Sequence, residues 1–249
     1  MKNSRGAIRV GIGGWVFPPW RGTFYPPGTR QADELAYASR QVTAIEINGT
    51  FYRTQTPASF RKWHGETPDD FVFSMKAPRY LTHRNELASA GDYTERFFTS
   101  GLTELGDKLG PILWQFAPFK QFEADDFTAF LKLLPHEIGG HRLRHVVEVR
   151  HASFRTPAFF DALREHRVAV ALVDDAKHPA FAELTADFAY LRLRQCKEDE
   201  PNGYTAAALD QWAEQLHGWS QEGRDCFLYF INGAKVRAPV AAQALIARL

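Results

Sequence analysis

The chain has 249 residues, 45% of them hydrophobic and 24% charged, and its formal net charge is +1. This composition is ordinary for a globular protein, and the near-neutral charge gives no general attraction for nucleic acid, membranes or acidic partners. Residues 1–7 are polar and no long apolar segment follows, so we expect a cytoplasmic protein with no membrane partner.

Strand-like apolar segments alternate with helical patterns along the whole chain. The first half is expected to hold a strand at 8–15, an aromatic loop at 17–28, a helix at 33–40, a strand at 42–48, a helix at 58–65, a strand at 71–77, a helix at 94–108 and a strand at 111–117. The second half is expected to hold a helix at 125–134, a strand at 145–150, a helix at 157–166, a strand at 168–174, a weak helical piece at 179–184, a strand at 188–194, a helix at 207–222, a strand at 226–231 and a final helix at 238–249.

Eight strand–helix units in a chain of this length predict an α/β fold, a (β/α)8 TIM-like barrel that forms a single domain over residues 1–249. The sixth helix is expected to be short or irregular. An open doubly wound sheet is the rival. Glu46 with Asn48, and Arg192 with Arg194, each share a strand face with apolar residues between them, which favours the barrel.

The two cysteines, Cys196 and Cys226, fall after the seventh strand and at the start of the eighth. Neighbouring parallel strands place those positions at opposite ends of a barrel. A disulfide between them is therefore not expected, which fits a reducing compartment.

Several segments resemble the uncharacterised family known as domain of unknown function 72, or YecE-like. The matching segments are VGIGGWVFPPWRGTFYPPG (10–28), ELAYASRQVTAIEINGTFYRTQTPASFRKWHGETPDDFVFSMKAPRYLTH (34–83), KLGPILWQFAPF (108–119), VVEVRHASF (146–154) and TADFAYLRLR (185–194). The resemblance implies a TIM-like barrel. It implies no established activity, and no catalytic residue can be carried over from it.

Two positions depart from the pattern of that family. Its seventh strand usually reads Tyr-x-Arg-x-His-Gly, whereas this chain has Tyr190, Arg192, Arg194 and Gln195. Its eighth strand usually ends in Phe-Asn-Asn-Asp, whereas this chain has Ile231, Asn232 and Gly233 after Phe230. These changes indicate a lost proton donor or an altered ligand.

Ionisable residues at strand ends are the candidate catalytic groups: Glu46, Lys76, Glu148 and Asp174. The carboxylates would meet at the mouth of a parallel barrel and could act as general acid and base. Lys76 could form a Schiff base if it is desolvated. Ion pairing of the acids with nearby cations, which would only hold the barrel rim, is the alternative interpretation.

Candidate substrate-binding residues surround the same mouth. They are Trp15, Asn48, Tyr52, His83, Gln115, Arg150, His151, Arg192, Arg194 and Asn232. Arginine suits phosphate or carboxylate, histidine transfers protons near neutral pH, and aromatic rings stack on sugars or bases. The excess of cations favours an anionic ligand.

No metal site and no cofactor are expected. Cations among the strand-end acids would repel a metal ion. The glycines at 11, 13 and 14 lack the spacing and the following helix of a dinucleotide fingerprint.

These residues predict an enzyme, a cofactor-independent hydrolase or isomerase acting on a small anionic (phosphate-like) or polyhydroxylated, sugar-like metabolite in the charged pocket. A nucleic-acid-binding or metal-dependent nuclease-like barrel is one alternative, supported mainly by fold analogy. A non-catalytic binding protein is another. The oligomeric state stays open.

Overall fold

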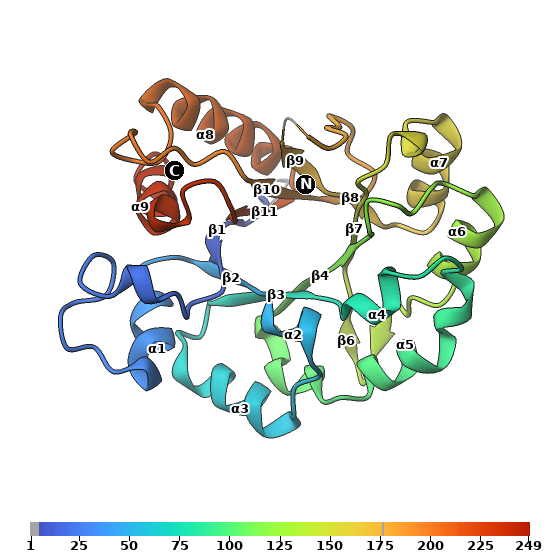
Figure 1. Cartoon of the computed structure of the whole chain (residues 1–249), viewed down its shortest axis with the longest axis horizontal. Coiled ribbons are helices and arrows are strands. Elements are labelled where there is room, and N and C mark those ends of the chain that lie inside the picture. Colours follow the sequence, from blue (N-terminus) through green and yellow to red (C-terminus); the bar gives the residue numbers. More distant parts are fainter. Residues whose placement is uncertain (1–4, 176) are drawn as a thin grey trace.

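The computed structural model describes residues 5–175 and 177–249, which form an α/β barrel of parallel strands ringed by helices (Figure 1). The barrel strands are β1 (Ile8–Gly13), β2 (Ala44–Ile47), β3 (Val72–Lys76), β4 (Leu109–Gln115), β7 (His145–Glu148), β8 (Ala169–Val170), β9 (Leu172–Asp174), β10 (Phe188–Leu193) and β11 (Asp225–Phe230). The predicted barrel is confirmed, and its eight predicted strand positions are all occupied.

The barrel is nearly closed by its sixth strand, which is divided into two short pieces. The sheet runs β8-β7-β4-β3-β2-β1-β11-β10-β9, and every neighbouring pair is parallel. Ala171 separates β8 from β9, so one piece pairs with β7 and the other with β10. The two ends of the sheet therefore meet in one continuous segment, 169–174.

Nine α-helices accompany the described strands, and the longer ones cover the outside of the barrel. They are α1 (Glu34–Ala38), α2 (Gly49–Tyr52), α3 (Pro57–Glu66), α4 (Arg79–Thr82), α5 (Gly91–Phe98), α6 (Ala124–Leu131), α7 (Pro157–Glu165), α8 (Ala206–Gln221) and α9 (Ala238–Ile246). The hydroxyls of Thr56 and Thr156 accept backbone N–H groups at the start of α3 and α7. A proline, which has no N–H to satisfy, follows each of these caps.

The main core lies between the strands and the helices. Trp114 on β4 packs edge-on against Phe97 of α5 and Phe130 of α6, with ring centroids 5.8 and 5.5 Å apart. Burial of such large apolar faces drives the helices onto the sheet. A second apolar cluster fills the interior of the barrel, which is therefore a packed core and not an open pore.

The structure corrects two details of the expected elements. The helix predicted at 94–108 ends at Phe98 and resumes as 3-10 turns at Leu102–Lys108. Gly101 adopts a left-handed φ of +95° at the break, and a side chain there would meet the ring of Pro57. No helix forms over 177–187, so the predicted piece at 179–184 is an irregular connection.

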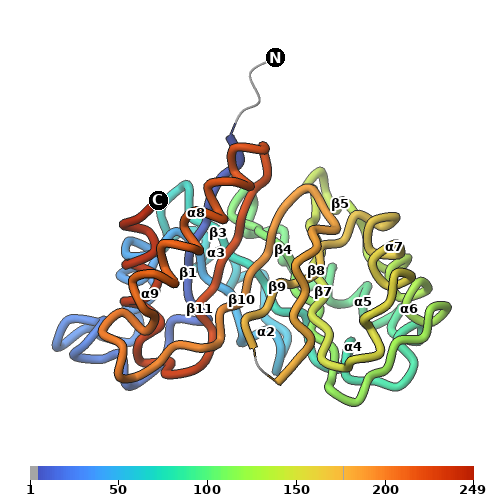
Figure 2. The backbone as a smooth tube through the Cα atoms, turned by 90° about the horizontal axis from the view of Figure 1, so that it is seen from above, coloured from blue at the N-terminus to red at the C-terminus, as the bar shows by residue number. Residues whose placement is uncertain are grey.

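Two short hairpin strands, β5 (Glu137–Ile138) and β6 (His141–Arg142), precede β7 at the N-terminal end of the barrel (Figure 2). The short helices α2 and α4 lie at the opposite end, directly after β2 and β3. His145, the first residue of β7, is buried, and its Nδ1 accepts a hydrogen bond from Trp114 Nε1 at 3.2 Å.

Candidate active site at the C-terminal mouth

The inner face of the barrel changes from apolar to charged toward the C-terminal ends of the strands. Ala44, Leu113, Val146 and Tyr190 belong to the interior cluster of β2, β4, β7 and β10. Two residues further along the same strands stand Glu46, Gln115, Glu148 and Arg192. Residues two apart share a strand face, so these four side chains enter the barrel above its apolar filling. The structure thus brings Glu46, Glu148 and Arg192 together.

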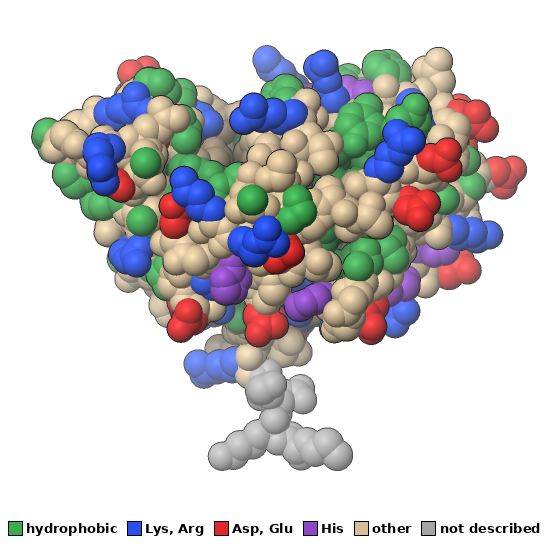
Figure 3. Space-filling model, turned by 90° about the horizontal axis from the view of Figure 1, so that it is seen from below, with side chains coloured by type: hydrophobic (Ala, Val, Ile, Leu, Met, Phe, Trp, Pro, Cys, Tyr) green, Lys and Arg blue, Asp and Glu red, His purple; other side chains and the backbone are tan. Residues whose placement is uncertain are grey.

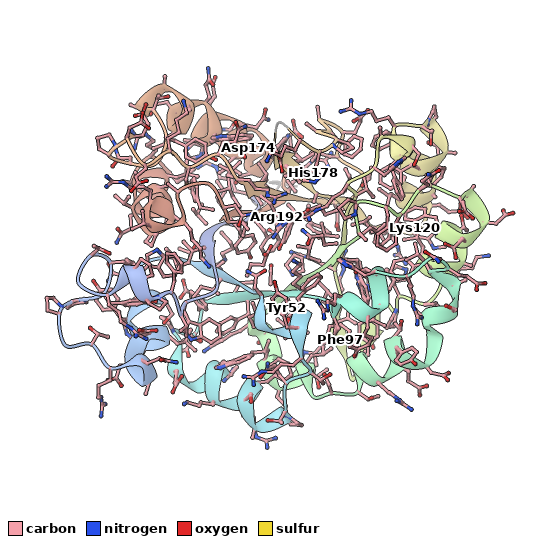
Figure 4. All side chains as sticks on the ribbon, in the orientation of Figure 1. Tyr52, Phe97, Lys120, Asp174, His178 and Arg192 are labelled. Atoms are coloured by element: carbon pink, nitrogen blue, oxygen red, sulfur yellow. The ribbon has the colours of Figure 1, made fainter. Side chains whose placement is uncertain are left out.

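Arg192, which is labelled in Figure 4, connects the two glutamates through ion pairs. Its Nε and Nη2 both donate to the carboxylate of Glu46, at 2.9 Å each. Its Nη1 donates to Glu148 Oε2. The side chains of Glu46, Glu148 and Arg192 are 0%, 2% and 2% exposed, so this three-residue network is sealed from water.

Further donors saturate the two carboxylates. Tyr190 OH donates to Glu46 Oε2 at 2.8 Å. Gln115 Nε2 and Arg150 Nε donate to Glu148 Oε1 at 2.6 and 3.1 Å. Buried charges need such partners because desolvation of an unpaired carboxylate costs several kcal/mol.

Glu148 and Arg192 keep their charges at neutral pH. Burial acts to raise the pKa of Glu148, but the positive charges of Arg192 and Arg150 outweigh it and bring the pKa down to about 2. Burial disfavours the charged form of Arg192, yet Glu148 and Glu46 raise its pKa above the ordinary value. Glu148 is therefore ionised at neutral pH.

Lys76, at the end of β3, differs from the other buried lysines. Among the described residues, Lys76, Lys108 and Lys120 are buried. Lys108 Nζ donates to the carbonyls of His64 and Thr67 at 2.6 and 2.9 Å. Lys120 Nζ contacts Asp126 at 2.7 Å. In residues 5–175 and 177–249, no hydrogen bond or ion pair engages Lys76 Nζ.

Burial and the neighbouring arginines favour an uncharged Lys76 amine, whereas the Phe51 ring beneath it favours the charged form. Its Nζ lies 3.6 Å above the ring of Phe51 on α2. Burial is the main cause that lowers its pKa to about 7, and Arg192 adds to the shift, while Glu46 and Glu148 oppose it. Lys76 Nζ has no hydrogen-bond partner in the described residues, yet it is not among the unpartnered atoms that the protein encloses completely. The amine therefore retains contact with solvent. Lys76 can therefore react with a molecule that enters the mouth.

Two arginines carry positive charge above the network. Arg150 follows β7 and uses its Nε for Glu148. Arg194 follows β10 and forms an ion pair with Asp175 at 2.8 Å. With its amide oriented toward Arg194, Asn232 accepts from Arg194 Nη2 at 3.0 Å. Burial lowers the pKa of Arg194, and Glu148 opposes that shift.

Asp174 does not join the other acids, in contrast to the predicted convergence. It pairs in register with Leu193, whose side chain belongs to the outer core, so Asp174 also points outward. Its carboxylate accepts from Tyr204 OH at 2.7 Å and from the Arg194 amide. Figure 4 shows it displaced from Arg192 toward α8. Burial raises the pKa of Asp174, and its neighbour Asp175 faces the mouth instead.

Trp15 and His151 have structural contacts. Gly14 takes a left-handed φ of +72°, so Trp15 leaves the strand pattern and packs outside the barrel against Trp63 of α3, with centroids 5.2 Å apart. His151 Nδ1 accepts from the Ser153 amide at 3.2 Å and so caps a 3-10 turn.

Two of the remaining predicted ligand contacts, Tyr52 and His83, lie against Phe51. Tyr52 is 71% exposed on α2, and its ring lies 5.2 Å from that of Phe51 (Figure 4). His83 lies 5.4 Å from the same ring, and burial followed by the charge of Lys76 lowers its pKa. The Asn48 amide donates to the Glu46 carbonyl at 3.3 Å.

Three residues at this mouth were not singled out from the sequence. Tyr190 stands two positions before Arg192, so strand alternation would have placed it on the same inner face. Phe51 lies within the most specific part of the family-like segment, but its position over Lys76 depends on α2. Asp175 follows a strand that is apolar on both faces, so the sequence does not show which way its side chain points.

A separate cavity of about 370 Å³ opens at the N-terminal end of the barrel, far from this network. Its lining includes Arg9, Arg142, Arg144 and Asp225. Arg144 pairs with Asp225 at 2.7 Å, and its guanidinium lies 5.5 Å over Phe188. In parallel barrels the chemistry is found at the C-terminal end, so we assign this cavity no reaction.

Potential metal ligands do not converge in the described residues: no three His, Cys, Asp or Glu side chains are grouped as an ion would require. Both described cysteines are free and buried. No helix in the same residues has the length and apolar character to cross a membrane.

The protein is thus a parallel α/β barrel with a buried Glu–Arg–Glu network at its C-terminal mouth. Beside the network lies a lysine that has no hydrogen bond or ion pair within the described residues. The chain belongs to the family described as "Protein of unknown function DUF72", whose profile matches residues 9–249.

Relatives support this assignment along the whole chain. UPF0759 protein YunF of Bacillus subtilis is 27% identical over 260 residues, which covers 91% of this chain and 89% of YunF. UPF0759 protein YecE of Escherichia coli is 30% identical over 148 residues, 59% of this chain and 50% of YecE. A solved DUF72 protein of Thermotoga maritima, TM1631, superposes with a TM-score of 0.80 at 24% identity, covering 97% of this chain and 98% of that one.

Proposed function

We propose that this protein is an enzyme, an isomerase or hydrolase without a cofactor, whose reacting group is the Lys76 amine. Its substrate is a small anionic or polyhydroxylated metabolite bound at the C-terminal mouth. The carrying observation is that Lys76 is buried and solvent-accessible at Nζ yet has no polar partner in the described residues. A lysine kept for structure would be hydrogen-bonded, as Lys108 and Lys120 are.

The positions of the other mouth residues support distinct roles. Arg150 and Arg194 supply positive charge for an anionic group. Glu46, Glu148 and Arg192 hold one another and give the pocket a rigid, preorganised field. An amine whose pKa lies at about 7 is divided between its acid and base forms at neutral pH, which is the favourable condition for proton transfer.

The nucleic-acid alternative receives less support. The net charge is +1, and Figure 3 shows basic and acidic side chains interspersed on the face it presents. Nucleic-acid-binding domains usually concentrate basic side chains on one face.

The test combines binding with turnover. The wild-type chain is screened against phosphosugars, sugars and organic acids by ligand-induced melting shift, and hits are followed by NMR in D2O for product and for deuterium entering the substrate. We expect Lys76→Met to lower turnover by about 10²-fold or more. Lys62→Met removes an exposed lysine of α3 and is the matched control, expected to keep full turnover.

Binding of a metabolite without turnover or exchange would instead favour the non-catalytic binding protein. Tight binding of duplex or single-stranded DNA that weakens steeply with salt would favour the nucleic-acid alternative. Equal turnover in wild type and Lys76→Met would overturn the role of Lys76.

A further inference from the structure

We propose that the Lys76 amine forms a covalent imine with the carbonyl group of a small aldehyde or ketone that also carries a carboxylate or phosphate. This inference deepens the proposed function and rests on it, since it names the substrate class and the bond that forms at the same mouth.

The position of the amine suits nucleophilic attack. Lys76 extends from the end of β3, a rigid barrel strand, and its Nζ is placed 3.6 Å over the Phe51 ring. The nearby carboxylates of Glu46 and Glu148 would hold an ammonium by ion pairing, but Arg192 already occupies both. The nitrogen lone pair is therefore not withdrawn by an acidic partner. A desolvated lysine of this kind is the usual nucleophile toward carbonyl carbon.

The anionic part of the substrate has an arginine site near the amine. Arg150 donates through Nε to Glu148, and among the described contacts its two Nη groups make no hydrogen bond. The charge of Arg150 reaches Lys76, since it contributes to the lowered pKa of that lysine. Arg194 is less available, because its Nη1 is enclosed and forms an ion pair with Asp175 at 2.8 Å.

The covalent step balances without any further reactant. The neutral amine attacks the carbonyl carbon, a C–N bond forms, and the carbonyl electron pair moves to oxygen. The two amine protons and that oxygen then leave as water, so that lysine and carbonyl compound become imine and water. Protonation of the imine nitrogen by solvent makes the adjacent C–H acidic, which leads to the isomerisation considered above. Addition of water to the imine carbon then releases the carbonyl product and restores the amine.

Reductive trapping tests the imine directly. The full chain is incubated with sodium cyanoborohydride and one of three probes: pyruvate for a carboxylate, dihydroxyacetone phosphate for a phosphate, or hydroxyacetone as the neutral counterpart. Peptide mass mapping then locates the reduced adduct. We expect one dominant adduct on Lys76, at least about tenfold more with one anionic probe than with hydroxyacetone. The preferred probe identifies the anionic group.

Matched variants make the result specific. Lys76→Met should abolish the adduct, and Lys62→Met should retain it. Arg150→Met should reduce trapping of the anionic probe toward the level of hydroxyacetone. The yield on Lys76 should rise as pH passes about 7, whereas labelling of exposed lysines should rise only at higher pH.

The outcomes separate the two proposals. If metabolites shift the melting temperature and turn over through Lys76 but neither anionic probe gives an adduct on Lys76 above that on exposed lysines, the imine is overturned and the proposed function stands. If no metabolite binds or turns over and no adduct forms, both fall. An adduct that is equal for hydroxyacetone and the anionic probes would overturn the assigned substrate class.

Discussion

The two ends of the barrel both join arginines to acids, but they do so in different surroundings. At the C-terminal mouth, Arg192 is 2% exposed and both of its glutamates are sealed. At the N-terminal end, Arg144 and its partner Asp225 are 26% and 29% exposed, and Arg142 and Asp187 are each 63% exposed. Water can replace an ion pair at the N-terminal end but not at the mouth.

The difference is what the proposed function of the mouth would require. A buried ion network is rarely more stable than apolar residues of the same volume, so its stability contribution does not explain it. Exposed pairs contribute about 0–1 kcal/mol and serve as solvated rim contacts. The charged layer at the mouth, with an unpartnered lysine beside it, is more consistent with a site that binds and polarises a ligand.

The largest expected effect comes from breaking the buried network. Arg192→Met leaves Glu46 and Glu148 without their common partner and should cost about 3–5 kcal/mol of unfolding free energy, or prevent folding. Chemical denaturation measures the loss.

The triple variant Glu46→Gln, Glu148→Gln, Arg192→Met removes all three charges and is the control. It should be clearly more stable than Arg192→Met alone, because no uncompensated charge remains. A triple variant no more stable than the single one would show that lost packing, rather than unpaired charge, dominates.

The next effect is an increase in the free energy of unfolding. Lys76 has a folded-state pKa of about 7 against an ordinary 10.5, so burying its charged form destabilises the protein. At about 1.4 kcal/mol per pKa unit, Lys76→Met should stabilise the fold by roughly 4–5 kcal/mol near pH 6–7 while it lowers turnover by about 10²-fold or more.

This gain should shrink as pH rises. The penalty is complete below the folded pKa of about 7 and disappears near 10.5, where the unfolded chain also loses the proton. Melting temperatures of wild type and Lys76→Met at pH 6.5 and pH 9.5 test the trend. Lys108→Met should instead destabilise, because Lys108 Nζ is hydrogen-bonded to two carbonyls. Stabilisation of both variants alike would contradict the distinction.

Acid should weaken the mouth through Glu148. Its pKa falls from an ordinary 4.5 to about 2 on folding, so its stabilising contribution is present above pH 4.5 and is lost as pH falls toward 2. The contribution amounts to roughly 3 kcal/mol. Urea unfolding of wild type and Glu148→Gln at pH 6, 4 and 3 should show their difference narrowing.

The exposed Glu104, which pairs with Arg61 at 2.7 Å, provides the control for acid. Glu104→Gln should differ from wild type by less than about 1 kcal/mol throughout. A difference for Glu148→Gln that stays constant with pH would place the effect in packing rather than in charge.

The inner charged layer could be predicted from strand alternation because polar and apolar residues differ sharply there. Glu46 and Arg192 each follow an apolar residue on one face, which marks that face as the interior. The sixth strand gave no such contrast, since Val170 to Val173 are apolar on both faces. The sequence therefore did not show which residues of this strand face the barrel interior, and Asp174 was expected in the position that Asp175 occupies.

Features that depend on backbone turns or on the absence of partners could not be predicted. Gly14 and Gly101 take left-handed conformations that redirect Trp15 and end α5. In the sequence, Lys76, Lys108 and Lys120 look alike, because nothing local reveals which carbonyls or carboxylates will reach each amine. Only the assembled fold separates Lys76, which has no polar partner among the described residues, from the hydrogen-bonded Lys108 and Lys120.

The smallest expected effect on stability concerns an exposed ion pair at the N-terminal end of the barrel. Arg142→Ala breaks the pair with Asp187, whose atoms lie 2.7 Å apart. Because both side chains remain hydrated before and after the change, the unfolding free energy should fall by no more than about 1 kcal/mol, and added salt should reduce even that. Denaturation at low and high salt measures both quantities. A loss as large as that of Arg192→Met would mean that hydration does not separate the two ends, and the functional interpretation of the mouth would lose its physical basis.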